Sequence, residues 1–185
     1  MPERLERLNF IRDRFPHRSE ILTVLGIALF VCHSWSVLGF LDRLPAFILY
    51  FRVTEIVQVF AFMMAFAFLE SLLVTGVLVF VSALLPSRWL KEGFAYKGFV
   101  LVLAVTVAAI IFQKNLEGKL PSPGILTLYW VAPLALASLI IGFVQMIPRA
   151  RAILINLADR VSIMLFVYVP IGLLSLMVVA LGNLL

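Results

Sequence analysis

Glu70 has the clearest capacity for chemistry in this chain, because it is a lone acidic side chain in a long apolar stretch. No Lys or Arg lies between Arg52 and Arg88. A carboxylate at mid-membrane depth costs roughly 2.5–3.5 kcal/mol on insertion scales, so it is expected to face a bundle interior or a watery cavity. Glu70 is therefore a candidate for proton relay or cation coordination. The alternative is a protonated carboxyl group that hydrogen-bonds to a neighbouring helix and serves packing only.

His33 is the second candidate, near the middle of another apolar stretch, within the segment CHSWS. If the two apolar helices are both centred in the bilayer, His33 and Glu70 differ in depth by only about 5 Å, at a rise of 1.5 Å per residue. At such depths the pair could share a proton or form a buried ion pair, which is a hypothesis. The alternative is a His33 ring that hydrogen-bonds to a backbone carbonyl.

Three further polar residues, Arg52, Glu55 and Gln58, precede Glu70. On an unbroken helix, Arg52, Glu55 and Glu70 fall within about 60° of one another. Arg52 and Glu55 also have the i, i+3 spacing that allows a helical ion pair. With Gln58 one turn deeper, these residues are expected to line the outer vestibule of a polar path to Glu70. An ordinary interfacial salt bridge is the alternative.

Small residues recur at four-residue spacing in the same two apolar stretches. Such stripes allow helices to approach closely where lipid removes the hydrophobic drive for association. They predict a contact between the first and second apolar helices, with His33 and Glu70 beside it. The residues are Ala28, Cys32 and Ser36 in the first stretch and Ala67, Ser71 and Thr75 in the second.

Most catalytic and metal chemistry has no motif in this sequence. One cysteine excludes an internal disulfide and a cysteine zinc site. Only one of the two histidines lies in an apolar stretch, so one chain cannot supply a bis-histidine haem pair. Neither HExxH, GxSxG nor a Walker glycine loop occurs. We therefore expect no metal site and no cofactor, and an enzyme is the least favoured class.

Composition identifies the elements that must position these residues. Hydrophobic residues make up 63% of the chain and charged residues 14%, against about 45–50% and 25% in soluble domains. Charge-free runs of about 20 residues match the hydrocarbon thickness as helices, which satisfy their own backbone hydrogen bonds in lipid. The net charge of +5 is carried by basic residues that flank these runs, which suits anionic headgroups rather than nucleic acid.

The sequence predicts an all-α, polytopic membrane helix bundle with five transmembrane helices. An N-terminal arm, residues 1–20, reads as an amphipathic helix on the headgroups, or else as a frayed charged tail. A single transmembrane domain, residues 21–185, follows. We expect a loop at 42–45, an interfacial approach at 46–53, a short basic connection at 150–160 and a bend at Pro170. The expected spans are about 21–41, 54–85, 94–113, 125–147 and 161–182.

Orientation follows from the positive charges. With five spans, 11 of the 15 Lys and Arg residues fall on the side of the N-terminus and 4 on the other side. The positive-inside rule then predicts a cytoplasmic N-terminus and an extracytoplasmic C-terminus, in the plasma (inner) membrane.

Two functions remain open from the sequence. The first is a non-enzymatic membrane subunit or scaffold that oligomerises or binds a membrane partner. The second is a small proton-coupled transporter or channel that uses a buried Glu70/His33 pair. Replacement of Glu70 distinguishes them, since only the second predicts loss of a pH-dependent flux.

Overall fold

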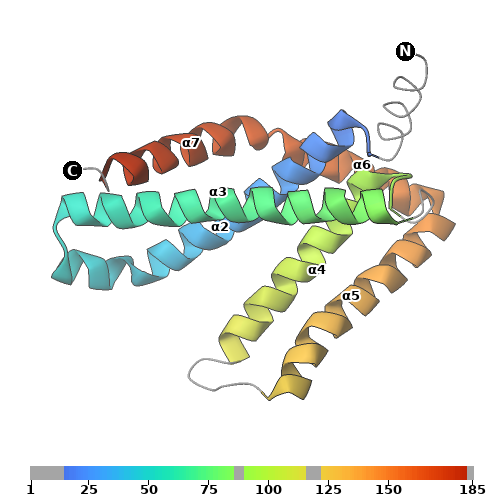
Figure 1. Cartoon of the computed structure of the whole chain (residues 1–185), viewed down its shortest axis with the longest axis horizontal. Helices are drawn as coiled ribbons and strands as arrows, with labels where there is room; N and C mark the ends of the chain where they lie inside the picture. The colour runs from blue at the N-terminus through green and yellow to red at the C-terminus, as the bar shows by residue number, and fades with distance from the viewer. Residues whose placement is uncertain (1–14, 86–89, 116–121, 183–185) are drawn as a thin grey trace, which may run out of the picture.

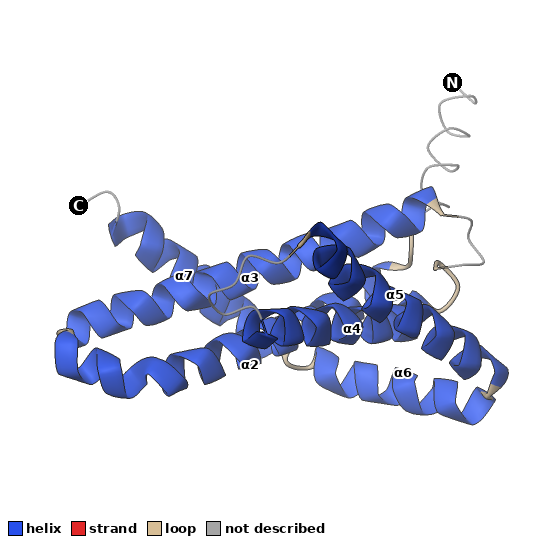
Figure 2. Cartoon of the chain, turned by 90° about the horizontal axis from the view of Figure 1, so that it is seen from below, coloured by secondary structure: helices blue, strands red, loops and turns tan. Residues whose placement is uncertain are grey.

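The computed structural model describes residues 15–85, 90–115 and 122–182, and within these ranges the chain forms helices and no strand (Figures 1 and 2). All of the helices except α6 are long and apolar enough to cross a membrane. The predicted fold class and the five spanning helices are thus confirmed, whereas the predicted N-terminal interfacial helix lies mostly in residues 1–14, outside the described ranges. In chain order the helices are α2 (Arg18–Tyr50), α3 (Val53–Leu84), α4 (Phe94–Asn115), α5 (Pro123–Met146), α6 (Pro148–Ser162) and α7 (Leu165–Gly182).

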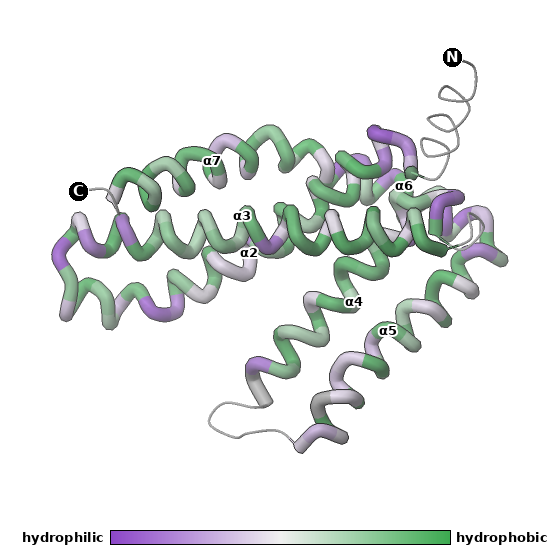
Figure 3. Tube along the Cα trace, in the orientation of Figure 1, coloured by the Kyte–Doolittle hydropathy of each residue, from purple (hydrophilic) through white to green (hydrophobic). Residues whose placement is uncertain are grey.

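The distribution of polar residues explains why these segments are helices in a membrane protein. Figure 3 shows hydrophobic residues over most of each spanning helix, with hydrophilic residues gathered at helix ends and along α6. A backbone in lipid has no water to bond, so each apolar segment must satisfy its own N–H and C=O groups as a helix. The side chains then face lipid or other helices.

The helices are arranged as an elongated layer and a diverging hairpin. Helices α2, α3 and α7 run side by side, and α2 has its most extensive contact with α3 (Figure 1). Helices α4 and α5 leave this layer at a steep angle. Helix α5 packs mainly against α4 and α6, and most of its surface is exposed. The hairpin therefore leaves much of its apolar surface outside the bundle.

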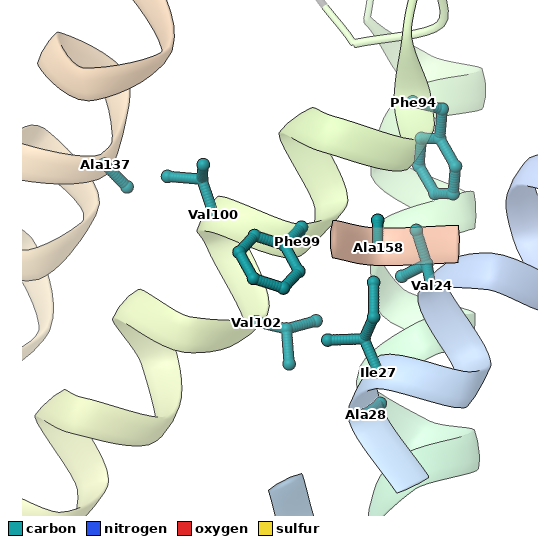
Figure 4. Close-up of a cluster of buried hydrophobic side chains, with 9 residues drawn as sticks. All are labelled: Val24, Ile27, Ala28, Phe94, Phe99, Val100, Val102, Ala137 and Ala158. Atoms are coloured by element: carbon teal, nitrogen blue, oxygen red, sulfur yellow. The ribbon is translucent and has the colours of Figure 1, made fainter. Parts of the chain in front are cut away.

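The core lies where α2, α4, α5 and α6 meet. Figure 4 shows Ala158 of α6 between Val24 of α2 and Phe94 of α4, and Val100 of α4 facing Ala137 of α5. Gly26 of α2 lies so close to α6 that a Cβ there would be 2.8 Å from the Cα of Ser162. This packing anchors α6 and the start of α4 to the first part of α2.

The first spanning helix does not end at Leu41, as the sequence predicted. Helix α2 continues through the expected loop at 42–45, with Pro45 inside it, and ends at Tyr50. Residues 46–50, predicted as an approach to the second helix, therefore belong to the first. The break lies at Phe51 and Arg52, whose backbones are extended. Helix α3 then covers almost the predicted 54–85.

The predicted basic connection at 150–160 is also wrong, because these residues form the middle of helix α6. Pro148 occupies the first turn of α6, where its missing N–H breaks no helical bond. Apolar and charged residues alternate with helical periodicity along α6, which produces one apolar face and one polar face. The last spanning helix consequently starts at Leu165 rather than at residue 161, and it runs through Pro170 to Gly182.

Candidate intramembrane polar site

The two small-residue stripes lie along the part of the bundle where α2 and α3 pack. Ala28 and Ser71 are fully buried, Ala67 and Thr75 are nearly so, and Cys32 and Ser36 are half-buried. The Cys32 thiol is hydrogen-bonded with the Ser71 hydroxyl, which joins the two helices at this level. The Ser71 hydroxyl itself donates to the carbonyl of Ala67 at 2.6 Å. The hydroxyl of Ser71 is thus satisfied, whereas the buried Oγ1 of Thr75 has no hydrogen-bond partner.

A cavity of about 230 Å³ opens beside this contact, between α2, α3 and α4. A buried water needs on the order of 15 Å³ of accessible space, so several waters fit. Its polar and aromatic lining comes from Glu70, Cys32, Trp35, Thr106 and Gln113, and aliphatic side chains complete it. Because α4 leaves the α2–α3 layer at a steep angle (Figure 1), we call this cavity between the three helices the wedge.

Glu70 is exposed in this wedge, at position 18 of the 32 residues of α3. Its carboxylate lies near the Cys32 thiol and interacts with it electrostatically. Among the described residues no basic side chain pairs with it. A carboxylate at the middle of a spanning helix, without a compensating cation from the described part of its chain, is the main chemical feature of the site.

His33 lies in a different environment from Glu70. The ring is fully buried, and Nδ1–H donates to the carbonyl of Leu29 at 2.9 Å. The ring packs on Tyr168 of α7, with centroids 4.8 Å apart, and Nε2 has no hydrogen-bond partner. Since neither ring nitrogen bonds to a carboxylate, the predicted proton-sharing pair with Glu70 is not formed. The backbone-bonded alternative describes His33 correctly.

The residues predicted to line one polar vestibule likewise lie in separate places. Arg52 precedes α3 as its N-cap, and its backbone N–H donates to Oε2 of Glu55 at 2.7 Å. Glu55 thereby caps the first turn of α3. Gln58 lines another cavity, of about 210 Å³, with residues of α7 such as Val178 and Val179. Gln58 therefore faces α7, whereas Glu70 faces α4, and the two cavities share no lining residue.

Sequence reasoning missed three residues of the Glu70 cavity. Trp35, Thr106 and Gln113 were not among the candidates predicted from the sequence. Thr106 and Gln113 are seven residues apart on α4, and Cys32 and Trp35 are three apart on α2, so each pair shares a helix face. That spacing is the signal that was available. The sequence does not give the placement of α4 relative to α3, which brings these residues and Glu70 to one cavity.

A second polar cluster at the α4–α6 end of the bundle was also missed. Lys97, counted in the sequence only as a topological charge, is 1% exposed. It interacts electrostatically with Glu92 and with Glu20 of α2. The guanidinium of Arg151 lies over the Tyr96 ring, 5.3 Å from its centroid. These contacts join α2, α4 and α6 at this end of the bundle.

No family model, curated protein or solved structure matches this chain. Within the described ranges, no group of three or more His, Cys, Asp or Glu side chains could hold a metal ion. The class of this protein therefore follows from its helices and from the Glu70 cavity alone. Its apolar helices are those of an integral membrane protein by length and composition, and the carboxylate of Glu70 lies in a cavity between three of them.

Proposed function

We propose that this protein is a non-enzymatic subunit of a membrane assembly, and that Glu70 is the group through which it binds a partner helix. The observation behind the proposal is the exposure of Glu70 at the middle of α3 without a cationic partner in the described part of the chain. An intramembrane carboxylate is expensive, at roughly 2.5–3.5 kcal/mol, unless another group compensates it. A partner helix in the wedge supplies that group.

The shape of the molecule supports this proposal. Glu70 and Ala109 both line the wedge and are exposed, so the wedge is accessible from outside the bundle. Small residues such as Ala109 line it, and these allow a helix backbone to approach closely. The Gln113 side chain, also in the lining, offers both a donor and an acceptor to an incoming polar group.

A partner with a basic residue at mid-membrane depth fits Glu70 better than a second copy does. No Lys or Arg occurs in the central third of α2, α3, α4, α5 or α7. A second copy therefore brings no Lys or Arg to the depth of Glu70, and its His33 is fully buried against Tyr168. The proposed partner is a different membrane protein, with a Lys, Arg or His in the middle of a spanning helix.

Replacement of Glu70 by Gln tests the proposal. The protein is extracted from its native membrane in lipid nanodiscs, and the mass of the intact particle is measured. We expect the wild type in a larger complex and Glu70→Gln as the single chain, because the amide cannot form the ion pair. Glu55→Gln is the control, since Glu55 caps α3 away from the wedge. An identical complex with Glu70→Gln would overturn the proposal.

A small cation- or proton-coupled transporter is the second candidate, because the volume of the Glu70 cavity admits several waters and part of its lining is polar. Since both ring nitrogens of His33 are turned elsewhere, this mechanism would use Glu70 with Gln113 and Thr106 instead. Purified protein in liposomes with an imposed pH gradient distinguishes the candidates. A flux that Glu70→Gln abolishes and Glu55→Gln preserves supports transport, whereas no flux from the wild type eliminates it.

A further inference from the structure

A large groove on the other side of α4 has no role in the proposed assembly. It has a volume of about 780 Å³ and lies between α4 and α5, with α6 closing one end. Its 17 lining residues are all Phe, Val, Leu, Ile, Ala or Pro. Phe99 and Val107 represent the α4 side, Leu136 and Phe143 the α5 side, and Ile153 the α6 side. Such a lining accepts hydrocarbon and no polar group.

The length of the groove matches one leaflet of a bilayer. On α4 the lining runs from Phe99 to Ile111, which is about 18 Å of helix at 1.5 Å per residue. The whole hydrocarbon core is about 30 Å thick, so one leaflet is about half of that. A spanning helix of a partner would leave half of its length outside such a groove. An acyl chain that enters from one membrane surface fits it.

The closed end of the groove is positively charged. Ala150 of α6 lines the groove, and its two neighbours in the chain, Arg149 and Arg151, are exposed. The contact between Arg151 and Tyr96 places that guanidinium at the start of α4, beside the same end. Basic side chains near a membrane surface attract anionic headgroups, at about 1 kcal/mol each. The groove thus has basic side chains at one end and hydrocarbon surface beyond them, which matches the headgroup and the acyl chain of an anionic phospholipid.

We propose that this groove binds an anionic phospholipid, with an acyl chain between α4 and α5 and the phosphate on Arg149 and Arg151. The lipid would fill the space that the diverging hairpin leaves open and would join α6 to α5. This site is separate from the Glu70 wedge, because the two cavities share no lining residue. The lipid proposal therefore does not depend on the proposed partner.

Native mass spectrometry of the protein from nanodiscs of equal phosphatidylglycerol and phosphatidylcholine tests the proposal. We expect the wild type to retain phosphatidylglycerol preferentially. The preference should fall about fivefold in Arg149→Gln and about thirtyfold when Arg151→Gln is added, if each charge contributes as basic residues near anionic membranes do. Arg160→Gln is the matched control, because it removes one exposed charge from α6 about 13 Å farther along the helix.

A second pair of variants tests the hydrocarbon part of the site. Ala132→Phe fills the groove from α5, whereas Ala135→Phe adds the same ring to an exposed position of α5 outside it. Loss of retained lipid in Ala132→Phe alone supports the proposal. Equal retention of both lipids by the wild type, or unchanged retention in Ala132→Phe, overturns it. Loss of protein partners rather than lipid in Ala132→Phe would assign the groove to a helix and would also overturn it.

Discussion

Glu70 and His33 are ionisable residues in adjacent apolar helices, yet their surroundings give them different roles. His33 is enclosed, with its ring on Tyr168 and one nitrogen on a carbonyl of its own helix. Glu70 is exposed in a wedge and has no cation from the described part of its chain. The first arrangement stabilises packing between α2 and α7. In the second arrangement the Glu70 carboxylate has no compensating positive charge among the described residues. Our functional proposal therefore rests on Glu70.

Independent roles predict additive effects for substitutions at these two positions. His33→Phe keeps the ring contact with Tyr168 and removes a buried Nε2 that has no partner, so its effect should be below about 1.5 kcal/mol. In the double variant with Glu70→Gln, the changes in unfolding free energy should add to within about 0.5 kcal/mol. Reversible unfolding in detergent measures all three variants. A coupling energy well above 1 kcal/mol would restore the His33–Glu70 pair.

The candidate polar residues show which features of the site the sequence alone could predict and which it could not. Glu70, His33 and the small stripes were recognisable because each interrupts an apolar run, and that much needs only the sequence. Which of them face one another depends on the rotation of each helix about its axis. A single residue changes that direction by about 100°. His33 and Cys32 are neighbours in the chain, and only Cys32 lines the Glu70 cavity.

At the scale of elements, the length of each apolar run predicted the spanning helices well. Charged residues and prolines within a segment were a poor guide to where a helix ends. Helix α3 was predicted within a residue at each end, because the polar residues around Arg52 and the proline at 86 bound a long apolar run. The end of α2 was missed because a charged pair followed by Pro45 resembles a loop, although a helix tolerates Pro where other contacts hold it. Helix α6 was missed because its basic residues resembled a connection.

Close packing of α7 on α3 gives a prediction at this scale. Gly172 of α7 lies against Phe68 of α3, and a Cβ there would overlap the Phe68 ring and lie under 3 Å from its Cβ. Because the ring is buried, Gly172→Ala must displace α7 and should cost about 1–3 kcal/mol. Gly142→Ala on α5 is the control, since its Cβ would meet nothing within 4 Å. Equal thermal stabilities for the two variants would show that α7 does not pack as described.

For the whole molecule, the charge distribution proposes an orientation. The end of the bundle formed by the first turn of α2, the start of α4 and helix α6 is the basic end, and the positive-inside rule assigns it to the cytoplasm. The same assignment puts the proposed lipid phosphate at the cytoplasmic leaflet, where anionic headgroups are enriched.

Single cysteines in a Cys32→Ser background test this orientation. Position 122 precedes α5 and position 149 begins α6, and both side chains are exposed. In intact cells, a membrane-impermeant maleimide should label Ser122→Cys and spare Arg149→Cys, and permeabilisation should expose both. The reverse pattern would contradict an extracytoplasmic C-terminus, and labelling of both in intact cells would contradict five spans.

The central claim is that a partner helix occupies the wedge beside Glu70, and photocrosslinking from within the wedge tests it most directly. A photoreactive benzoylphenylalanine replaces Ala109, which is exposed and lines the wedge, or Ala135 on the lipid-facing side of α5 as the control. In native membranes we predict a polypeptide adduct from position 109 that disappears with Glu70→Gln and persists with Glu55→Gln. Adducts to lipid alone, or a polypeptide adduct that Glu70→Gln leaves unchanged, would contradict the claim.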